Sequence, residues 1–355
     1  MRRPLLHFAF FLLSATFVQA QVTLDADGAG NTYELINSVL APGYDAVEVP
    51  DCGHTTFGRH IEETFDATLN TDVFRFIAHV TPDNDRCINF DRQRVEIKTY
   101  NQSPDNLKAV QGETVVYTWK FKIDANFQPS SSFTHIHQIK SVGGPYASIP
   151  MITLTLRKAS PDRLELRYTP TNSQTTIDQA ALSLFKGFWI EVTETIAYDD
   201  AGSYSIELKR VSDGQVLLDH SNNNMDTWQD GASFARPKWG IYRSLNNPAD
   251  LRDEEMFFAN FSIEEIGSLS VTDLERKADD ILLTPNPSSD IIRIKNLRSD
   301  DYDSIHLYDS IGQLISLNRR LKRNKIDVSG LQTGLYYIVI RNNKNTAKVL
   351  KCMVE

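Results

Sequence analysis

The sequence predicts an all-β protein: a two-sheet antiparallel sandwich of the jelly-roll type, followed by a small C-terminal β-sandwich. From residue 74 onward, segments in which apolar and polar residues alternate follow one another, as in 117–123, 152–157 and 204–209. This period of two is typical of half-buried antiparallel strands. Turn-rich clusters separate the segments, and no long amphipathic helix interrupts them. Strands without helical crossovers favour two packed sheets.

The N-terminal residues predict a secretory signal peptide. Arg2 and Arg3 precede an apolar run from 5 to 18, and a small-residue cleavage site follows it. We therefore expect residues 1–20 to be removed and the mature chain to begin at Gln21. No later stretch is long and apolar enough to span a bilayer, so we expect an exported protein that is not inserted into a membrane.

A length of 355 residues suits one large domain and one smaller domain. We expect the large domain over 21–266, a polar linker over 267–280 and the small domain over 281–355. The net charge of −9 argues against general nucleic-acid binding, which needs a basic surface. A local group of Arg and Lys can still bind an anionic substrate.

Two of the three cysteines, Cys52 and Cys87, lie in the same region of the chain, whereas Cys352 lies at its far end. In an oxidising compartment the first two are expected to form a disulfide. Two separate buried thiols are the alternative.

Two regions have residues of the kinds that bind metal ions. Asp25, Asp27 and Glu34 are loose candidates for a structural calcium site, although no Glu stands at position 12 of an EF-hand loop. A solvated turn is the alternative. His54 and His60 could serve a metal or a substrate, but their spacing is not diagnostic. No organic cofactor is expected.

Three polar strand segments, 92–98, 134–140 and 238–243, carry the candidate site. In 134–140, Gln138 and Lys140 are predicted to share one face and His135 and His137 the other, unless a bulge breaks the register. The other two segments place on one face Arg94, Glu96 and Lys98, and Lys238, Gly240 and Tyr242, respectively. Close approach of a ligand would explain a glycine in mid-strand. Each segment alone is also compatible with a solvated strand.

Together these groups favour β-elimination on a uronic acid over hydrolysis, which needs paired carboxylates. Gln138 and Arg94 are suited to neutralise the uronate carboxylate. Lys140 and Tyr242 are the candidate base and acid, since neighbouring cations would lower a pKa that is ordinarily near 10. The remaining substrate-binding candidates are His137, Lys238, Arg243 and Arg59.

The motifs Arg94-Val95-Glu96, Gln138-Ile139-Lys140 and Lys238-x-Gly240-x-Tyr242 are similar to three strand motifs of jelly-roll alginate lyases. Over a longer span, 21–263 resembles the ulvan lyases of polysaccharide lyase family 28. The segments that carry this resemblance are 94–100, 131–140, 237–246 and 251–255.

The family 28 resemblance implies endo-acting cleavage of ulvan, a sulfated algal polysaccharide, between sulfated rhamnose and a uronic acid. It implies that Tyr242 is catalytic, that Gln138 contacts the carboxylate, and that Arg94 and Lys238 bind the anionic chain. Lys140 stands where the alginate-lyase motif has His. The identity of the base therefore stays open between Lys140, Tyr242 and a histidine that a bulge places on the same face. His137 is the candidate for that histidine.

The last 75 residues resemble the C-terminal sorting domain of type IX secretion. The matching stretches are Pro285-Asn286-Pro287, Leu307-Tyr308-Asp309, and Ile326-Asp327-Val328-Ser329 with the Leu331 to Tyr336 segment. The resemblance implies the type IX machinery as a partner and an extracellular or cell-surface location. It usually also implies removal of the tail.

Three alternatives stay open. A non-catalytic module could bind an anionic glycan on the same fold, a lyase could act on another uronic-acid polymer such as alginate or glucuronan, and a hydrolase could use acids that the motifs do not reveal.

Overall fold

The computed structural model describes residues 21–266, 282–295, 297, 304–309, 313–318, 324–341 and 347–355. The predicted signal peptide (1–20) and linker (267–280) lie outside these residues. The chain divides into two units, 1–268 and 269–355, each of which has its own hydrophobic core.

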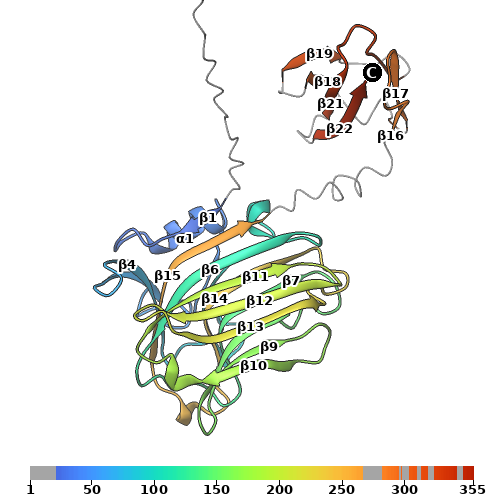
Figure 1. Ribbon diagram of the computed structural model, residues 1–355. Helices are drawn as coiled ribbons and strands as arrows, with labels where there is room; N and C mark the ends of the chain where they lie inside the picture. Colours follow the sequence, from blue (N-terminus) through green and yellow to red (C-terminus); the bar gives the residue numbers. More distant parts are fainter. Residues whose placement is uncertain are drawn as a thin grey trace, which may run out of the picture. The chain divides into compact units, whose positions relative to one another are not determined.

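An eight-stranded antiparallel sheet forms one layer of the first unit, in the order β13-β12-β11-β6-β15-β4-β3, with β1 paired to β15 (Figure 1). Its strands are β1 (Val22–Leu24), β3 (Ile61–Asp66), β4 (Thr71–Ala78), β6 (Thr114–Ile123), β11 (Trp189–Ala197), β12 (Gly202–Arg210), β13 (Val216–Met225) and β15 (Glu254–Glu265). The alternation that the sequence showed in 117–123 and 204–209 lies in β6 and β12.

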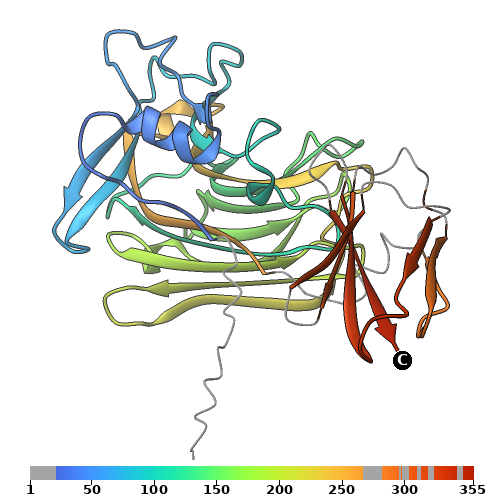
Figure 2. The ribbon, with the colours of Figure 1, turned by 90° about the horizontal axis from the view of Figure 1, so that it is seen from above.

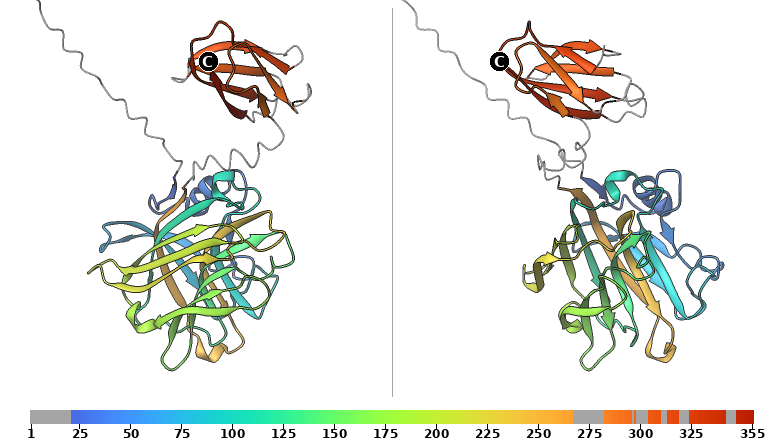
Figure 3. Two further views of the ribbon diagram at one scale, coloured as in Figure 1. Left: turned by 45° about the vertical axis from the view of Figure 1, so that its right-hand side comes forward. Right: turned by 90° about the vertical axis from the view of Figure 1, so that its right-hand side faces the viewer.

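A seven-stranded antiparallel sheet has the order β10-β9-β8-β7-β14-β5-β2. It forms the other layer, and Figure 3 shows the packed strands of the first unit from two further sides. Its strands are β2 (Val47–Glu48), β5 (Arg92–Lys98), β7 (Thr134–Val142), β8 (Ile152–Arg157), β9 (Arg163–Tyr168), β10 (Thr175–Ala181) and β14 (Phe234–Ser244). All three polar segments of the sequence lie in this sheet, and its central strands β7, β14 and β5 are adjacent. The predicted all-β sandwich is confirmed.

The core of the first unit lies between the two sheets. Trp119 of β6 and Trp239 of β14 meet across the layers with ring centroids 6.0 Å apart, and both are buried. Ile139 of β7 and Leu154 of β8 extend the same apolar layer and are fully buried. Burying a side chain of this size stabilises the fold by about 1.5–3 kcal/mol, so the inner face of each strand fixes its register.

One helix, α1 (Thr32–Leu40), was not predicted. Its buried Ile36 and Leu40 are four residues apart and therefore lie on one side of the helix, packed against the core. It lies beside β1 in Figures 1 and 2. Three short 3₁₀ turns also lie in the first unit, within residues 21–266: Asp105–Leu107, Leu182–Leu184 and Pro248–Asp250. No helix in the described ranges is both long and apolar enough to cross a membrane.

The predicted disulfide between Cys52 and Cys87 is confirmed. It joins the segment that follows β2 to the segment that precedes β5. Closing a loop of this length stabilises the fold by roughly 4 kcal/mol in the chain-entropy account.

The second unit is a small β-sandwich around its own core. One sheet has the order β16-β17-β20 and the other β19-β18-β21-β22. The strands are β16 (Leu282–Thr284), β17 (Ile291–Lys295), β18 (Ser304–Asp309), β19 (Leu314–Asn318), β20 (Lys325–Asp327), β21 (Gly334–Arg341) and β22 (Ala347–Val354). Ile292, Leu307 and Ile338 are buried in this core, as is the free thiol of Cys352.

Candidate active site

The outward face of the seven-stranded sheet carries rows of polar side chains, which we call the polar face. Directly opposed residues of antiparallel strands point to the same side, so the register defines each row. One row runs Arg94, Tyr242, His135, Thr155, Glu165, and a second runs Lys98, Lys238, Gln138, Thr153, Arg167. Lys140 opposes Arg236 at the next position.

The polar face is strongly cationic although the chain is acidic. Its basic residues are Arg92, Arg94, Lys98, Lys140, Arg157, Arg163, Arg167, Arg236 and Lys238, and its carboxylates are Glu48, Glu96 and Glu165. Nine cations stand against these three strand carboxylates and against Asp85 and Asp91, which pair with Arg94 and Arg92, so four positive charges remain in excess in a chain whose net charge is −9. Such a local field concentrates a polyanion at this face.

A pair of bulges decides which histidine reaches the polar face. The register shifts between His135 and His137 in β7 and between Trp239 and Tyr242 in β14. Because a bulge adds an unpaired residue, His135 lies on the same face as Gln138 although the two are three positions apart. The two histidines therefore lie on opposite faces.

His137 is a core residue, so the prediction that it binds substrate is wrong. Its Nε2 lies 2.8 Å from Glu194 Oε2, and its Nδ1 lies 3.0 Å from the carbonyl oxygen of Lys238. The Trp119 ring packs against it at 4.3 Å, and the imidazole has no exposed surface. A buried polar group needs such partners, and these account fully for its presence.

Gly240 is explained by the backbone of the neighbouring strand rather than by a ligand. Its φ is +142°, and an added Cβ would stand 2.1 Å from the carbonyl oxygen of Val95 and 2.7 Å from Cα of Glu96. The sequence-based explanation by ligand approach is therefore replaced by close packing of β14 on β5 at the bulge.

Glu96 is the centre of the buried part of the polar face. Its carboxylate accepts hydrogen bonds from Arg94 Nη1, from Gln138 Nε2 and, at 2.6 Å, from Lys238 Nζ. Burial alone would raise the pKa of Glu96, but Lys238 and Arg94 outweigh it and hold that pKa below its usual value. Lys238 also pairs with Glu48 Oε2 at 2.5 Å. Arg94, Gln138 and Lys238 are thus brought together as predicted, around a carboxylate of the protein itself.

Tyr242 lies at the more open end of this network. The guanidinium carbon of Arg94 stands 3.7 Å from the centre of its ring, and Arg92 Nη1 donates to its hydroxyl at 3.0 Å. The His135 ring lies 5.8 Å away, and the Phe133 ring contacts both, at 4.8 Å from His135 and 5.1 Å from Tyr242. The phenol is therefore fixed by cations and rings while it stays half-buried.

The pKa values of Lys140 and His135 are both lowered, which favours the neutral form of each side chain. Burial, followed by the charges of Lys238 and Arg236, lowers the pKa of Lys140 to about 8. Its Nζ donates to the carbonyl oxygen of Ser148 at 3.1 Å. Burial, with Arg157 and Arg94 acting in the same direction, lowers the pKa of His135 to about 3. His135 is therefore neutral at pH 7, but a base of pKa near 3 accepts a proton far less readily than Lys140.

Arg236 is a site residue that the sequence reasoning missed. It lies on β14, two positions before Lys238 and therefore on the same face. This spacing is the one sequence feature that could have identified it as a site residue. Its Nε and Nη1 are buried and have no hydrogen-bond partner among the described residues. Burial lowers the pKa of Arg236. A guanidinium that opposes Lys140 and has two nitrogens without a protein partner adds a positive charge that is free to act on an anionic ligand at this part of the polar face.

Two other residues predicted to contact the substrate, Arg243 and Arg59, bind protein groups away from the polar face. Arg243 points to the inner face, has no exposed surface, and donates to Gln93 Oε1 and to the carbonyl oxygen of Ala78. The prediction for Arg243 is wrong because residues 242 and 243 alternate faces. Arg59 forms a bidentate ion pair with Glu34, with both distances 2.6 Å, and it stacks on Tyr33 beside α1 rather than joining the polar face.

The predicted calcium ligands do not converge. Glu34 belongs to α1 and is paired with Arg59, while Asp25 accepts a hydrogen bond from Asn260 Nδ2 at 3.1 Å. The backbone N–H groups of Asp27 and Gly28 donate to Glu63. The helix carries Glu34 toward Arg59, and calcium binding at these three residues stays a prediction.

Comparison with known proteins identifies the class of protein to which the chain belongs. A family model described as Polysaccharide lyase matches residues 74–262, more than half of the chain. The chain therefore belongs to the polysaccharide lyase family. A second model, described as Secretion system C-terminal sorting domain, matches residues 283–355. The protein is thus directed through type IX secretion to the extracellular space or the cell surface.

Solved structures with similar folds include three polysaccharide lyases. The endo-β-1,4-glucuronan lyase of the fungus Trichoderma reesei is 16% identical, with 57% of this chain and 86% of that chain covered and a TM-score of 0.42. The PL-14 alginate lyase of Aplysia kurodai is 13% identical, with coverages of 69% and 98% and a TM-score of 0.44. Alginate lyase Aly36B is 11% identical, with coverages of 70% and 98% and a TM-score of 0.45. No curated protein matches the chain.

Proposed function

We propose that this protein is an endo-acting lyase that cleaves ulvan by β-elimination and releases oligosaccharides with an unsaturated uronyl end. The observation that carries the proposal is the polar face, where a phenol and an amine of lowered pKa lie in one cationic array. Membership of the polysaccharide lyase family supports the reaction class. The resemblance of the strand segments to family 28 supports the substrate.

In the proposed reaction, the neutral amine of Lys140 takes the C5 proton of the uronic acid. The electron pair of that C–H bond forms the C4=C5 double bond, and the bond from C4 to the leaving oxygen breaks. Tyr242 donates its hydroxyl proton to that oxygen. Solvent then takes the proton from Lys140 and returns one to Tyr242, which restores the enzyme.

The carbanion-like charge that develops at C5 is delocalised into the uronate carboxylate, so a cation must lie against that group. Arg236 opposes Lys140 and has two unpaired buried nitrogens, which suits this role. Arg94 and Gln138 both donate to Glu96 and lie on the same polar face. Their engagement with Glu96 makes them a preorganised support for the site, which lowers the cost of ordering it during the reaction.

The outer strands of the polar face supply cations beyond those that one carboxylate needs. Arg157 and Arg167 both pair with Glu165 on β9, and Arg163 lies opposite Arg157. This surplus fits a polymer that carries sulfate as well as carboxylate groups. Ulvan is such a polymer, and this supports it over an unsulfated chain.

The proposal is tested by incubating the purified full chain with ulvan, alginate, glucuronan and a glycosaminoglycan. The ultraviolet absorbance of the unsaturated product and the appearance of reducing ends are followed together. We expect both to rise on ulvan. A rise only on another polymer would contradict the substrate, and reducing ends without absorbance would show hydrolysis. Binding without either signal would identify a non-catalytic module.

Replacing Arg236 with glutamine is expected to lower kcat/KM on ulvan by about 10-fold to 100-fold. This corresponds to the loss of a charge-assisted hydrogen-bonding group that contributes about 1.5–3 kcal/mol. The matched control is Arg75→Gln on the eight-stranded sheet, which removes the same charge from the pairs with Glu62 and Glu255. Equal effects of the two substitutions would show that only the net charge matters and would exclude the assigned contact.

A further inference from the structure

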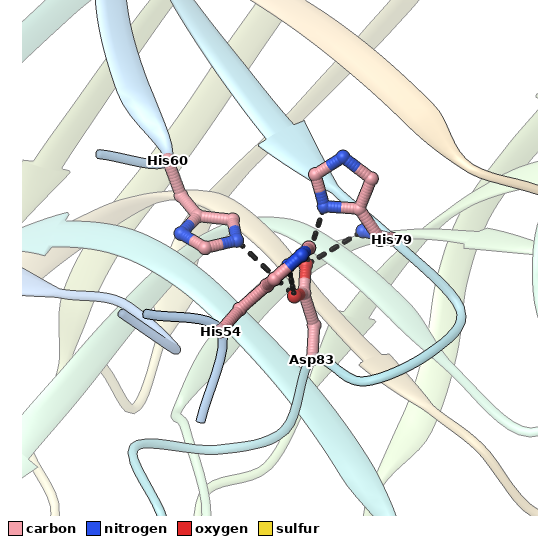
Figure 4. Close-up of side chains that lie close together, drawn as sticks. All are labelled: His54, His60, His79 and Asp83. Carbon is pink, nitrogen blue, oxygen red and sulfur yellow. Dashed lines mark hydrogen bonds and ion pairs between the residues drawn. The ribbon is translucent and has the colours of Figure 1, made fainter. Parts of the chain in front are cut away.

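Three histidines and one aspartate meet beside the disulfide, apart from the polar face. His54 follows β2, His60 directly precedes β3, and His79 and Asp83 come from the segment after β4 (Figure 4). All three rings point toward the Asp83 carboxylate, and one ligand atom from each of the four residues lies within 4.8 Å of the others. His60 and Asp83 are buried, and His54 and His79 are half-buried.

The spacing of these atoms is close to that of a tetrahedral metal site. His54 Nδ1 lies 2.8 Å from Asp83 Oδ1, His60 Nε2 lies 3.1 Å from the same oxygen, and His79 Nδ1 lies 3.1 Å from Asp83 Oδ2. In a tetrahedral zinc site, metal–ligand distances of about 2.0–2.1 Å place neighbouring ligand atoms about 3.3 Å apart. Small side-chain shifts would therefore convert three contacts to one carboxylate into four contacts to one ion.

A further carboxylate orients one of the proposed ligands from behind. Asp51 Oδ1 lies 2.6 Å from His60 Nδ1, and Asp51 Oδ2 accepts a hydrogen bond from the Tyr33 hydroxyl at 2.9 Å. The same hydroxyl accepts the backbone N–H of His60 at 2.9 Å. A carboxylate on the distal nitrogen of a histidine fixes the tautomer whose Nε2 lone pair faces the metal, and this arrangement accompanies most histidine ligands.

We propose that His54, His60, His79 and Asp83 bind one divalent transition-metal ion of the zinc class. Three imidazoles and one carboxylate are the donor set that such ions select, whereas calcium and magnesium select oxygen donors. The ion is structural in this assignment, because all four coordination positions are filled by the protein. All four ligands lie within the loop that the Cys52–Cys87 disulfide closes.

The metal site is connected to the polar face by two short routes. Two residues after Asp83, Asp85 accepts hydrogen bonds from Arg94 Nε at 2.8 Å and Nη2 at 3.3 Å, and Arg94 lies over the Tyr242 ring. On the other side, the carbonyl oxygen of His79 accepts from Gln93, which in turn accepts from Arg243, the residue next to Tyr242. The ion would therefore position the strand ends that hold Tyr242.

The experiment uses the full chain, exported to an oxidising compartment and purified without a polyhistidine tag. The chain is stripped with a chelator and titrated with cobalt(II), whose visible absorption is far stronger in tetrahedral than in octahedral sites. We expect one equivalent per chain with the tetrahedral spectrum, displacement of that spectrum by zinc, and a rise in Tm with zinc but not with calcium. These readouts do not depend on catalysis, so they remain valid whatever the polysaccharide assays show.

The ligand variants are His60→Gln, His79→Gln and Asp83→Asn, and each is expected to weaken metal binding by at least about 100-fold. Asp51→Asn is expected to weaken it by about 10-fold to 100-fold. The control is His220→Gln on β13, whose imidazole lies 3.6 Å from Asp178 and outside the cluster. It should bind metal like the unmodified chain.

Two results would overturn the assignment. One is a ligand variant that folds and still binds metal as tightly as the unmodified chain. The other is an unmodified chain that takes up no cobalt, or takes it up only with an octahedral spectrum. The second result decides the question even if every ligand variant fails to fold.

Discussion

Replacing Tyr242 with phenylalanine is expected to reduce kcat on ulvan by about 10²-fold to 10⁴-fold while the protein stays folded. The substitution removes only the hydroxyl that would protonate the leaving oxygen, and proton transfer by a positioned side chain contributes a factor of this size. The ring remains, so the contact with the Arg94 guanidinium at 3.7 Å is kept. Substrate binding should therefore change little, and the loss should appear in kcat rather than in KM.

Tyr168→Phe is the matched control for this substitution. Tyr168 lies on β9 of the same sheet, and its hydroxyl donates to the carbonyl oxygen of Asp226 at 2.7 Å. Removing it costs one hydrogen bond, or about 1 kcal/mol of unfolding free energy, without touching the polar face. Denaturant unfolding of both variants separates stability from catalysis. Full turnover by the Tyr242 variant would exclude the hydroxyl as the proton donor.

The strands of this protein are predictable because each alternates a core side chain with an outward one. Trp119 and Trp239 bury large apolar surfaces at the predicted inner positions, and a slip of one residue would expose them. The helix α1 was missed because its apolar residues, Tyr33, Leu35, Ile36, Val39 and Leu40, repeat over only nine positions. So short an apolar pattern cannot be told from a loop without its packing partners.

The bulge in β7 shows where sequence reasoning fails at the site. Strict alternation places His135 and His137 together, and only the pairing of β7 with β8 and β14 reveals the extra residue. The outcome exchanges the roles of the two histidines: one joins the row of Tyr242 and the other pairs with Glu194 in the core. A bulge is a property of two strands, so no single strand's sequence encodes it.

The partners of the predicted cations are also non-local. Glu48 lies on the short strand β2 and pairs with Lys238, which is 190 positions further along the chain. Lys98 donates to the same carboxylate at 2.7 Å. Motif spacing finds the cations on β5, β7 and β14, but it does not show that Glu48 and Glu96 neutralise part of them. The unpaired groups that remain for substrate, above all Arg236, become visible only after this pairing is known.

The second large expected effect concerns Lys140. The direction in which activity changes with pH depends on whether its amine acts as a base or only as a cation. As the base, it must be neutral, and its pKa lies near 8, below the ordinary value, because of burial and the neighbouring Lys238 and Arg236. The neutral fraction therefore grows as the pH rises through 8. We expect kcat/KM on ulvan to increase from pH 6 to about pH 8 and to level off above it.

Lys140→Arg separates the two roles, because a guanidinium keeps the positive charge but is not deprotonated in proteins. If Lys140 is the base, this variant should lose about 10²-fold to 10⁴-fold in kcat, as Lys140→Met should. Lys120→Arg on β6, which faces Glu191 at 3.1 Å, is the matched control and should keep full activity. If Lys140 instead binds the substrate as a cation, the arginine variant stays active and the unmodified enzyme loses activity above pH 8. The base would then have to be sought at Tyr242 or His135, which follow Arg94 in the first row of the polar face.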